Sequence, residues 1–266
     1  MKFSTAVQIE PSSFHIDPFE QMLFVGSCFA DSMGQRFKDN LFRAVVNPYG
    51  VMYNPASVLH TIQRSDEAPR VAILTLGTNH VYILKETNEI VDNCQKRPQS
   101  LFREEKLSVE SCAAYLAKAV DILYSRNPEV KVIVTISPIR YAKYGFHGSQ
   151  LSEATLLLAA DRLVGLYPDV VTYFPAYEIV NDELRDYRFY QEDMLHPTPQ
   201  AVSYIEQRFS EVFFSDAAKR FVEEWLPIKK ALSHRPFNPD SAEYQTFFKK
   251  ALEDKQALLR RYGQVD

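Results

Sequence analysis

The chain has 266 residues and a mass of 30.7 kDa, and its 46% hydrophobic and 24% charged residues exclude an intrinsically disordered protein. Its formal net charge is −4 at pH 7, whereas general nucleic-acid binders are more often basic, so we expect no nucleic-acid partner. No stretch approaches the roughly 20 apolar residues of a membrane-spanning helix, and the N-terminus lacks the apolar core of a signal peptide; we expect a cytoplasmic protein without a membrane partner.

The three cysteines, Cys28, Cys94 and Cys112, are an odd and widely spaced set. The sequence contains neither a CxxC pair nor an HExxH motif, which are spacings that commonly bind zinc. We therefore expect no disulfide framework and no bound metal ion.

Four short apolar runs recur along the chain, and each is followed by small or polar residues. The runs are residues 22–25, 71–76, 131–136 and 170–174. Runs this short and this apolar are typical of strands that are covered on both faces, as in a parallel sheet. The residues that follow such strands lie at the sheet edge where ligands of α/β proteins bind.

Helical patterns separate these runs. Ser108 is predicted to cap one helix, which ends before Pro128, and Ser152 to cap another, which ends at Pro168. The alternation of strands and helices predicts a three-layer α/β/α sandwich with a mostly parallel sheet.

Two regions depart from this alternation. Residues 81–84 and 89–91 predict a β-hairpin inserted after the strand at 71–76. No strand is expected beyond residue 210, so residues 211–266 are predicted to form a helical C-terminal extension of a single domain that spans residues 1–266. The last helix, capped by Ser241, carries an apolar stripe. Packing of this stripe on the body is favoured, and a homo-oligomer interface is the alternative.

The first predicted strand ends in Gly26-Ser27-Cys28, just before a helical pattern. Glycine permits a tight turn from strand to helix, and serine and cysteine side chains both act as catalytic nucleophiles. A helix N-terminus offers free N–H groups and the positive end of the helix dipole, which lower the pKa of a thiol and stabilise an oxyanion. Ser27 and Cys28 are therefore candidate nucleophiles.

A second candidate group lies late in the chain, where Asp193 and His196 precede a helix that Thr198 and Pro199 are predicted to begin. At this spacing a carboxylate can accept a hydrogen bond from His Nδ1 while Nε2 faces a nucleophile. Asp193 and His196 are therefore predicted to form the orienting and basic parts of a catalytic triad.

A nucleophile after the first strand and an Asp-x-x-His motif near the end of the catalytic domain is the layout of the SGNH hydrolases (GDSL-type esterases), which this sequence resembles. More closely, the chain resembles the GSCFA family, named for the pentapeptide that stands here at residues 26–30. Further segments similar to that family are residues 47–55, 76–82, 91–98, 135–156, 173–197 and 234–241. The resemblance implies the SGNH hydrolase fold, with a flavodoxin-like sheet, and ester hydrolysis that needs no cofactor.

The resemblance also bears on the choice of nucleophile. In the Gly-Asp-Ser motif of SGNH hydrolases the nucleophile stands two residues after the glycine. That position is Cys28 here, and Ser27 stands at the position of the aspartate. Cys28 is therefore favoured, with Ser27 as the alternative, and a thiol beside His196 can form a thiolate–imidazolium pair.

The same resemblance suggests donors for an oxyanion hole. Gly50 is the candidate for the block II glycine, and Gly77 and Asn79 match the Gly-x-Asn part of block III, although His80 stands where that motif has Asp. The alternative donors are the Thr78 hydroxyl and the side chains of Asn54 and Asn93.

Further polar residues are candidates for substrate binding. Lys96, which follows the predicted hairpin, and Arg140, which follows a central strand, could bind a carboxylate or phosphate of the substrate. The other candidate contacts are Asn54, Thr78, Asn93, Ser137 and His147.

The predicted function is hydrolysis of an ester, with an acetyl ester of a saccharide as the first candidate substrate. Cys28 or Ser27 attacks the carbonyl carbon and forms a covalent acyl-enzyme, His196 transfers the proton, and Asp193 fixes the histidine tautomer. Two alternatives are an acyltransferase acting on a glycan or lipid precursor, and a non-catalytic binding protein that retains the fold.

Overall fold

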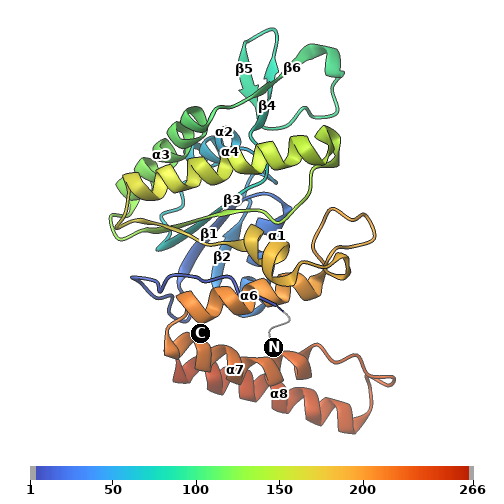
Figure 1. Cartoon of the computed structure of the whole chain (residues 1–266). Coiled ribbons are helices and arrows are strands. Elements are labelled where there is room, and N and C mark those ends of the chain that lie inside the picture. The colour runs from blue at the N-terminus through green and yellow to red at the C-terminus, as the bar shows by residue number, and fades with distance from the viewer. Residues whose placement is uncertain (1–3, 264–266) are drawn as a thin grey trace.

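Five parallel strands form the central sheet, in the order β2-β1-β3-β7-β8 (Figure 1). They are β1 (Gln21–Gly26), β2 (Arg43–Val46), β3 (Val71–Leu76), β7 (Lys131–Ile136) and β8 (Val171–Tyr173). This computed structural model describes residues 4–263, so residues 1–3 and 264–266 of the predicted domain lie outside the described residues. The strand order is the flavodoxin-like order and confirms the predicted fold class.

Helices cover both faces of this sheet because its strands are apolar on both sides. In β1, Met22 and Phe24 pack with α1 and α6, whereas Leu23 and Val25 pack with the helices of the other face. Figure 1 shows α2, α3 and α4 on one side of the sheet and α1 and α6 on the other. Their bounds are α1 (Cys28–Asp39), α2 (Pro55–Arg64), α3 (Val109–Arg126), α4 (Gly145–Leu166), α5 (Ala176–Glu178) and α6 (Pro199–Phe213).

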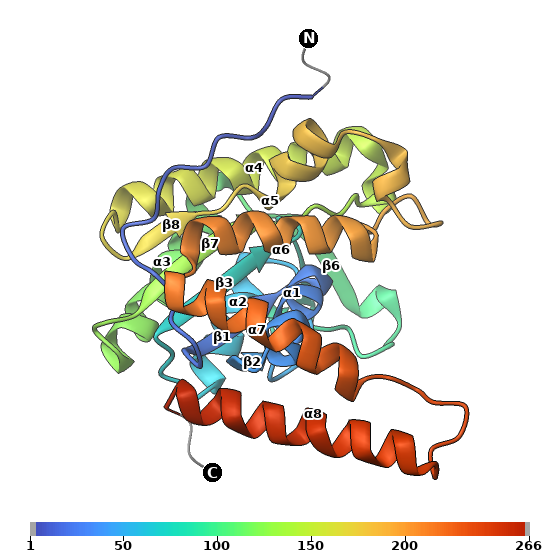
Figure 2. The same cartoon turned by 90° about the horizontal axis from the view of Figure 1, so that it is seen from below.

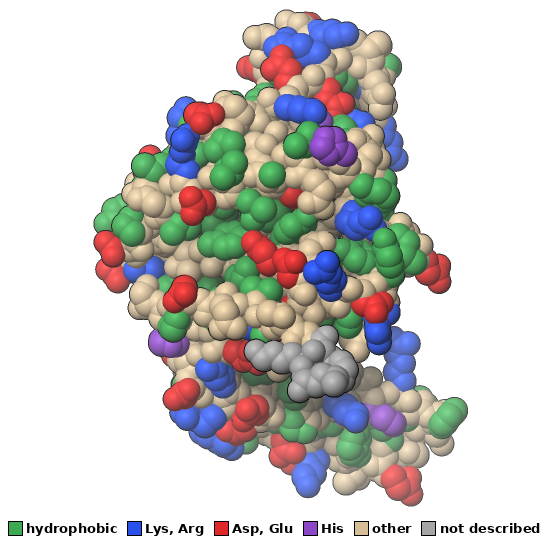
Figure 3. Space-filling view, viewed as in Figure 1, with side chains coloured by type: hydrophobic (Ala, Val, Ile, Leu, Met, Phe, Trp, Pro, Cys, Tyr) green, Lys and Arg blue, Asp and Glu red, His purple; other side chains and the backbone are tan. Residues whose placement is uncertain are grey.

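Helix α4 corrects one prediction, since it begins at Gly145 and Ser152 lies inside it. The Ser152 hydroxyl is buried and accepts the N–H of Asn79 at 3.0 Å, so it serves the loop after β3 rather than the start of its own helix. On its outer side α4 leaves Leu151 and Leu158 more than half exposed. In Figure 3 hydrophobic side chains gather at the level of this helix.

The predicted hairpin is confirmed as part of a separate antiparallel sheet in the order β5-β4-β6. Its strands are β4 (His80–Leu84), β5 (Glu89–Val91) and β6 (Phe102–Lys106). The third strand, with the sequence FREEK, has one buried residue, Phe102. It therefore lacks the apolar alternation by which a strand is recognised in a sequence.

Two helices follow the sheet, α7 (Asp216–Leu232) and α8 (Ala242–Arg261), and Figure 2 shows α8 lying outside α7. Leu258 of α8 packs with Phe221 and Trp225 of α7, so the apolar stripe is covered in part from within the chain, as favoured above. The Trp225 indole N–H donates to the main-chain oxygen of Asp39 at 2.8 Å, which joins the pair to the end of α1.

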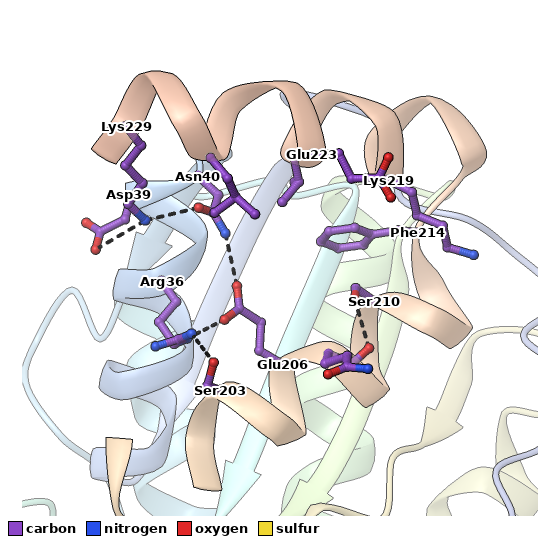
Figure 4. Close-up of a pocket in the computed structure, with 13 residues that line it drawn as sticks. Arg36, Asp39, Asn40, Ser203, Glu206, Ser210, Phe214, Lys219, Glu223 and Lys229 are labelled. Carbon is purple, nitrogen blue, oxygen red and sulfur yellow. Dashed lines mark hydrogen bonds and ion pairs between the residues drawn. The ribbon is translucent and has the colours of Figure 1, made fainter. Parts of the chain in front are cut away.

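A cavity of about 420 Å³ lies where α1, α6 and α7 meet (Figure 4). Several of its polar side chains contact one another: Arg36 pairs with Glu206, and Lys229 donates to Asn40 Oδ1 at 3.1 Å and lies 3.9 Å from Asp39 Oδ2. Asn40 Nδ2 in turn donates to Glu206 at 3.0 Å. The polar contacts around this cavity therefore join α7 to α1 and α6. Between residues 4 and 263, no helix is long and apolar enough to span a bilayer.

Candidate functional site

The turn from β1 into α1 is built around a glycine that no other residue could replace. Gly26 has φ +146°, and a Cβ at this position would lie 2.0 Å from the Thr75 main-chain oxygen of the neighbouring strand. Ser27 caps α1, and Cys28 is the first residue of the helix. As predicted, the thiol and the hydroxyl thus stand at the carboxyl edge of the sheet.

The Ser27 hydroxyl is fully buried and saturated with hydrogen bonds. It lies 2.6 Å from Ser137 Oγ and 3.2 Å from Thr75 Oγ1, and it accepts the N–H of Phe29 at 3.1 Å. These contacts tie together the ends of β1, β3 and β7. Ser137, a predicted substrate contact, is thereby a buried partner of Ser27.

Cys28, by contrast, is a partly exposed free thiol. Burial raises its pKa, and the carboxylates of Asp31 and Asp193 raise it further, while the N–H groups of Cys28 and Phe29 oppose the shift. The expected lowering of the thiol pKa by the helix terminus is therefore wrong, because desolvation and two negative charges outweigh it. The contribution of Asp193 also indicates that the late motif lies close enough for its charge to act on Cys28.

Asp193 and His196 form the predicted pair, with 2.6 Å between Oδ2 and Nδ1. The other carboxylate oxygen accepts the N–H groups of Leu195 and His196 at 2.9 and 3.0 Å. These main-chain hydrogen bonds, followed by the one from the imidazole, lower the pKa of Asp193 to about 2. A carboxylate that accepts from Nδ1 leaves Nε2 as the basic nitrogen.

Contacts from β7 hold this loop against the sheet edge. Arg140, four residues after β7, donates its main-chain N–H to Leu195 O and its Nη1 to Met194 O, both at 3.1 Å. Ser137 of the same segment bonds to Ser27. No hydrogen bond joins Cys28 Sγ to His196 among the described residues, as is common where such bonds tighten only with substrate present.

The predicted oxyanion donors are all engaged within the protein. Gly50 N–H donates to Asn47 O, and Gly77 N–H to Tyr53 O, both at 2.8 Å. Asn79 donates its N–H to Ser152 Oγ and its Nδ2 to Leu107 O at 2.8 Å, which turns its carboxamide toward the inserted sheet. Cys28 N–H, as the first of α1, has no intrahelical acceptor.

The remaining sequence candidates are spread over several environments. Thr78 is buried and bonds to Ser152, and Asn54 caps α2 by accepting the N–H of Ser57 at 3.0 Å. The exposed candidates are Asn93, Lys96 and His147. Of the substrate candidates, Arg140 alone is hydrogen-bonded to the loop that carries His196, among the residues that the structure describes.

Tyr141 was not predicted, yet its hydroxyl lies at the nucleophile turn. A Cβ added to Gly77 would be 2.6 Å from this hydroxyl and 3.5 Å from Ser27 Cβ. The hydroxyl is buried and has no hydrogen-bond partner among the described residues. Burial raises the Tyr141 pKa, and Tyr53 and Cys28 add to the shift. The ring of Tyr53 packs edge-on against it, with the centroids 6.1 Å apart.

The chain belongs to the GSCFA family, whose model matches residues 21–71 and 67–209. A second model, described as the C-terminal domain of a GSCFA domain protein, matches residues 225–266. The gap between the matched segments lies close to residue 211, where the helical extension is predicted to begin. No group of His, Cys, Asp or Glu side chains within residues 4–263 is arranged to hold a metal ion.

Two solved structures resemble the fold. A carbohydrate esterase family 3 protein from Talaromyces cellulolyticus has 11% identity and a TM-score of 0.46, over 76% of this chain and 98% of the other. A catalytic mutant of an acetylxylan esterase from Geobacillus stearothermophilus has 13% identity and a TM-score of 0.47, over the same shares. Values this low do not carry function from one protein to another. No curated protein matches the chain.

Proposed function

We propose that this protein hydrolyses an ester through a covalent acyl-enzyme on Cys28, with His196 as the base and Asp193 as the residue that orients it. The observation that carries the proposal is the 2.6 Å hydrogen bond between Asp193 and His196 Nδ1, in a loop whose carboxylate acts electrostatically on the thiol of Cys28. Ser27 is the less suitable nucleophile because its hydroxyl is buried and fully bonded.

The raised pKa of Cys28 defines the order of the first step. The thiol is neutral at rest, so His196 Nε2 takes its proton as Sγ attacks the ester carbonyl carbon. The tetrahedral intermediate then collapses, the bond to the alcohol oxygen breaks, and His196 returns the proton to that oxygen. His196 then deprotonates a water molecule that attacks the thioester carbonyl carbon; the C–S bond breaks, the carboxylic acid is released, and His196 returns the proton to Sγ.

The negative oxygen of the intermediate needs two or three donors. The N–H of Cys28 supplies one. We assign the Tyr141 hydroxyl as another, because it is an unpartnered donor at the Gly77–Ser27 corner and because the predicted amides are already engaged. The half-exposed ring of Tyr53 packs edge-on against this tyrosine.

The candidate substrate is an acetyl ester of a saccharide, as expected from the sequence. His196 has 41% of its side chain exposed, and this access for water favours hydrolysis over transfer to a glycan or lipid acceptor. A binding protein without activity is the second candidate, favoured by the raised thiol pKa and by the missing hydrogen bond between Cys28 and His196 among the described residues.

The test is hydrolysis of p-nitrophenyl acetate by the parent and by three variants, Cys28→Ala, His196→Ala and Cys94→Ala. Cys94 is also a partly exposed free thiol and serves as the matched control. The first two variants are expected to lose at least about a thousandfold in kcat while the third keeps the parental rate. Equal rates in all four proteins would reject the esterase and leave the binding protein.

A further inference from the structure

A separate cavity of about 290 Å³ adjoins the loop that carries His196. Its volume is at the lower end of the range for small-molecule sites. Its wall includes polar and aromatic side chains, those of Arg140, Gln150, Asn181, Arg185, Tyr187 and Tyr190. They come from the loop after β7, the first turns of α4 and the segment that follows α5, so the fold assembles them from three parts of the chain.

The wall is rich in hydrogen-bond donors that the protein leaves unused. The Arg185 guanidinium has no hydrogen bond or ion pair among the described residues, and only Nη1 of the Arg140 guanidinium is bonded, to Met194 O. Gln150 accepts the Tyr177 hydroxyl on Oε1, which leaves its Nε2 as a donor. The acid in the wall, Asp186, is paired with Arg188 at 2.7 Å. The cavity therefore suits a ligand with several acceptor oxygens and a negative charge.

Aromatic rings complete the cavity. Tyr187 is 67% exposed, and the Arg140 guanidinium lies 5.9 Å from its ring centroid and 5.5 Å from that of Tyr190. Tyrosine offers an apolar ring face with a polar tip. Rings in a cavity that also holds guanidinium groups can bind the apolar face of a sugar while the cations bind an acidic substituent.

The position of the cavity relates it to one side of the substrate. Met194 and Leu195, which Arg140 holds, precede His196 directly, and Tyr190 pairs with Pro197 on the other side of the histidine. In the mechanism above His196 gives its proton to the departing alcohol oxygen. The alcohol part of the ester must therefore lie against this loop, which the cavity adjoins through Arg140 and Tyr190.

We propose that the cavity binds a carboxylate or phosphate on the alcohol part of the substrate, so that the ester cleaved is that of an acidic sugar. This inference rests on the proposed function. Its core is the juxtaposition of two guanidinium groups, the unused amide donor of Gln150 and tyrosine rings beside the loop of the catalytic base.

The test compares three acetyl esters at the same ring hydroxyl: one of methyl glucoside, one of methyl glucuronide and one of glucose 6-phosphate. We expect kcat/KM to be at least about tenfold higher for one or both acidic esters, mainly through KM, because a charge-assisted bidentate contact binds ground and transition states alike. The two acidic esters separate a carboxylate from a phosphate ligand. Equal or better hydrolysis of the neutral ester would overturn the inference.

Arg185→Gln tests the cavity itself, with Arg162→Gln as the control that removes the same charge from a side chain 50% exposed, paired with Glu110 and outside the cavity wall. The preference for the acidic ester should fall to about one in Arg185→Gln and remain in Arg162→Gln. If no ester is cleaved, the proposed function fails, and calorimetric titration with methyl glucuronide and glucose 6-phosphate decides the inference separately. If the parent binds either acidic sugar and Arg185→Gln does not, the anion site is supported. If the parent binds neither, the anion site is rejected.

Discussion

The two sides of the strand end differ in how their polar groups are supported. On the inner side, Ser27, Ser137 and Thr75 form a buried cluster that joins three strands. On the outer side, Cys28 and the Asp193–His196 pair are partly exposed, and the pair is held by a loop rather than by the sheet. The comparison teaches that the hydroxyl is buried within the fold and the thiol is accessible at its edge, although they are neighbours in sequence.

The largest effect that would sharpen this contrast is expected at Tyr141, a half-buried residue whose buried hydroxyl we assign to the oxyanion hole. Tyr141→Phe should lower kcat for p-nitrophenyl acetate by a hundredfold to a thousandfold, about 3 to 4 kcal/mol of transition-state stabilisation. The melting temperature should stay the same or rise, because the hydroxyl makes no hydrogen bond that the fold would lose.

Tyr167→Phe is the control. The Tyr167 hydroxyl donates to Asp121 at 2.7 Å, and the residue lies just before β8, at the sheet edge opposite the nucleophile turn. This variant should keep full activity and lose about 1 kcal/mol of stability. A Tyr141→Phe enzyme with the parental kcat would remove Tyr141 from the oxyanion hole.

The next largest effect is expected at Glu153 and concerns the stability of the fold. Burial raises the pKa of Glu153 to about 7, against the opposing influence of Ser149, Arg140 and Tyr177. The folded protein therefore keeps a proton that the unfolded chain releases above its ordinary carboxyl pKa. Between about pH 4.5 and 7 the unfolded state binds fewer protons, so this group lowers the stability as the pH rises.

Glu153→Gln should remove that pH dependence. At pH 8 the variant is expected to be more stable than the parent by up to about 3 kcal/mol, and at pH 4 the two should be equal. Urea denaturation at both pH values measures the difference. A variant that is less stable at pH 8 would mean that the Glu153 carboxylate is ionised and favourable in the fold.

The smallest effect tests the inner cluster directly. Ser27→Ala removes the cap of α1 and leaves Ser137 and Thr75 without their shared partner, so it should destabilise the protein by about 2 kcal/mol. Ser32→Ala, an exposed change in the same helix, should stay within about 0.5 kcal/mol of the parent. A Ser27→Ala protein of parental stability but without esterase activity would make Ser27 the nucleophile and reverse the contrast.

The sequence predicted the parts of the molecule whose signals are contiguous. Gly26, Ser27 and Cys28 follow one apolar run, and Asp193 and His196 are three residues apart, so both motifs are legible without a structure. The strand β2, only four residues long, and the charged strand β6 were missed because neither shows a clear apolar pattern.

Groups that depend on partners from several elements could not be predicted. The Tyr141 hydroxyl becomes notable only because the fold places it close to Gly77, beside the nucleophile turn, and no hydrogen-bond partner is present among the described residues. The amides of Gly50 and Gly77 stand in the loops where donors were expected, but hydrogen bonds to Asn47 and Tyr53 already use them. Motif spacing locates a main-chain N–H group without revealing whether it already donates a hydrogen bond within the protein.

Helix α1 makes different connections at its two poles. Its first residues leave main-chain N–H groups beside the thiol, whereas the carbonyl of Asp39 at its far end accepts the indole of Trp225. The N-terminus of α1 thus offers main-chain donors to the site, whereas its C-terminus uses a main-chain acceptor to bind α7. Substitutions in α7 and α8 can therefore change how firmly the far end of α1 is held while the main-chain N–H groups beside Cys28 Sγ stay the same.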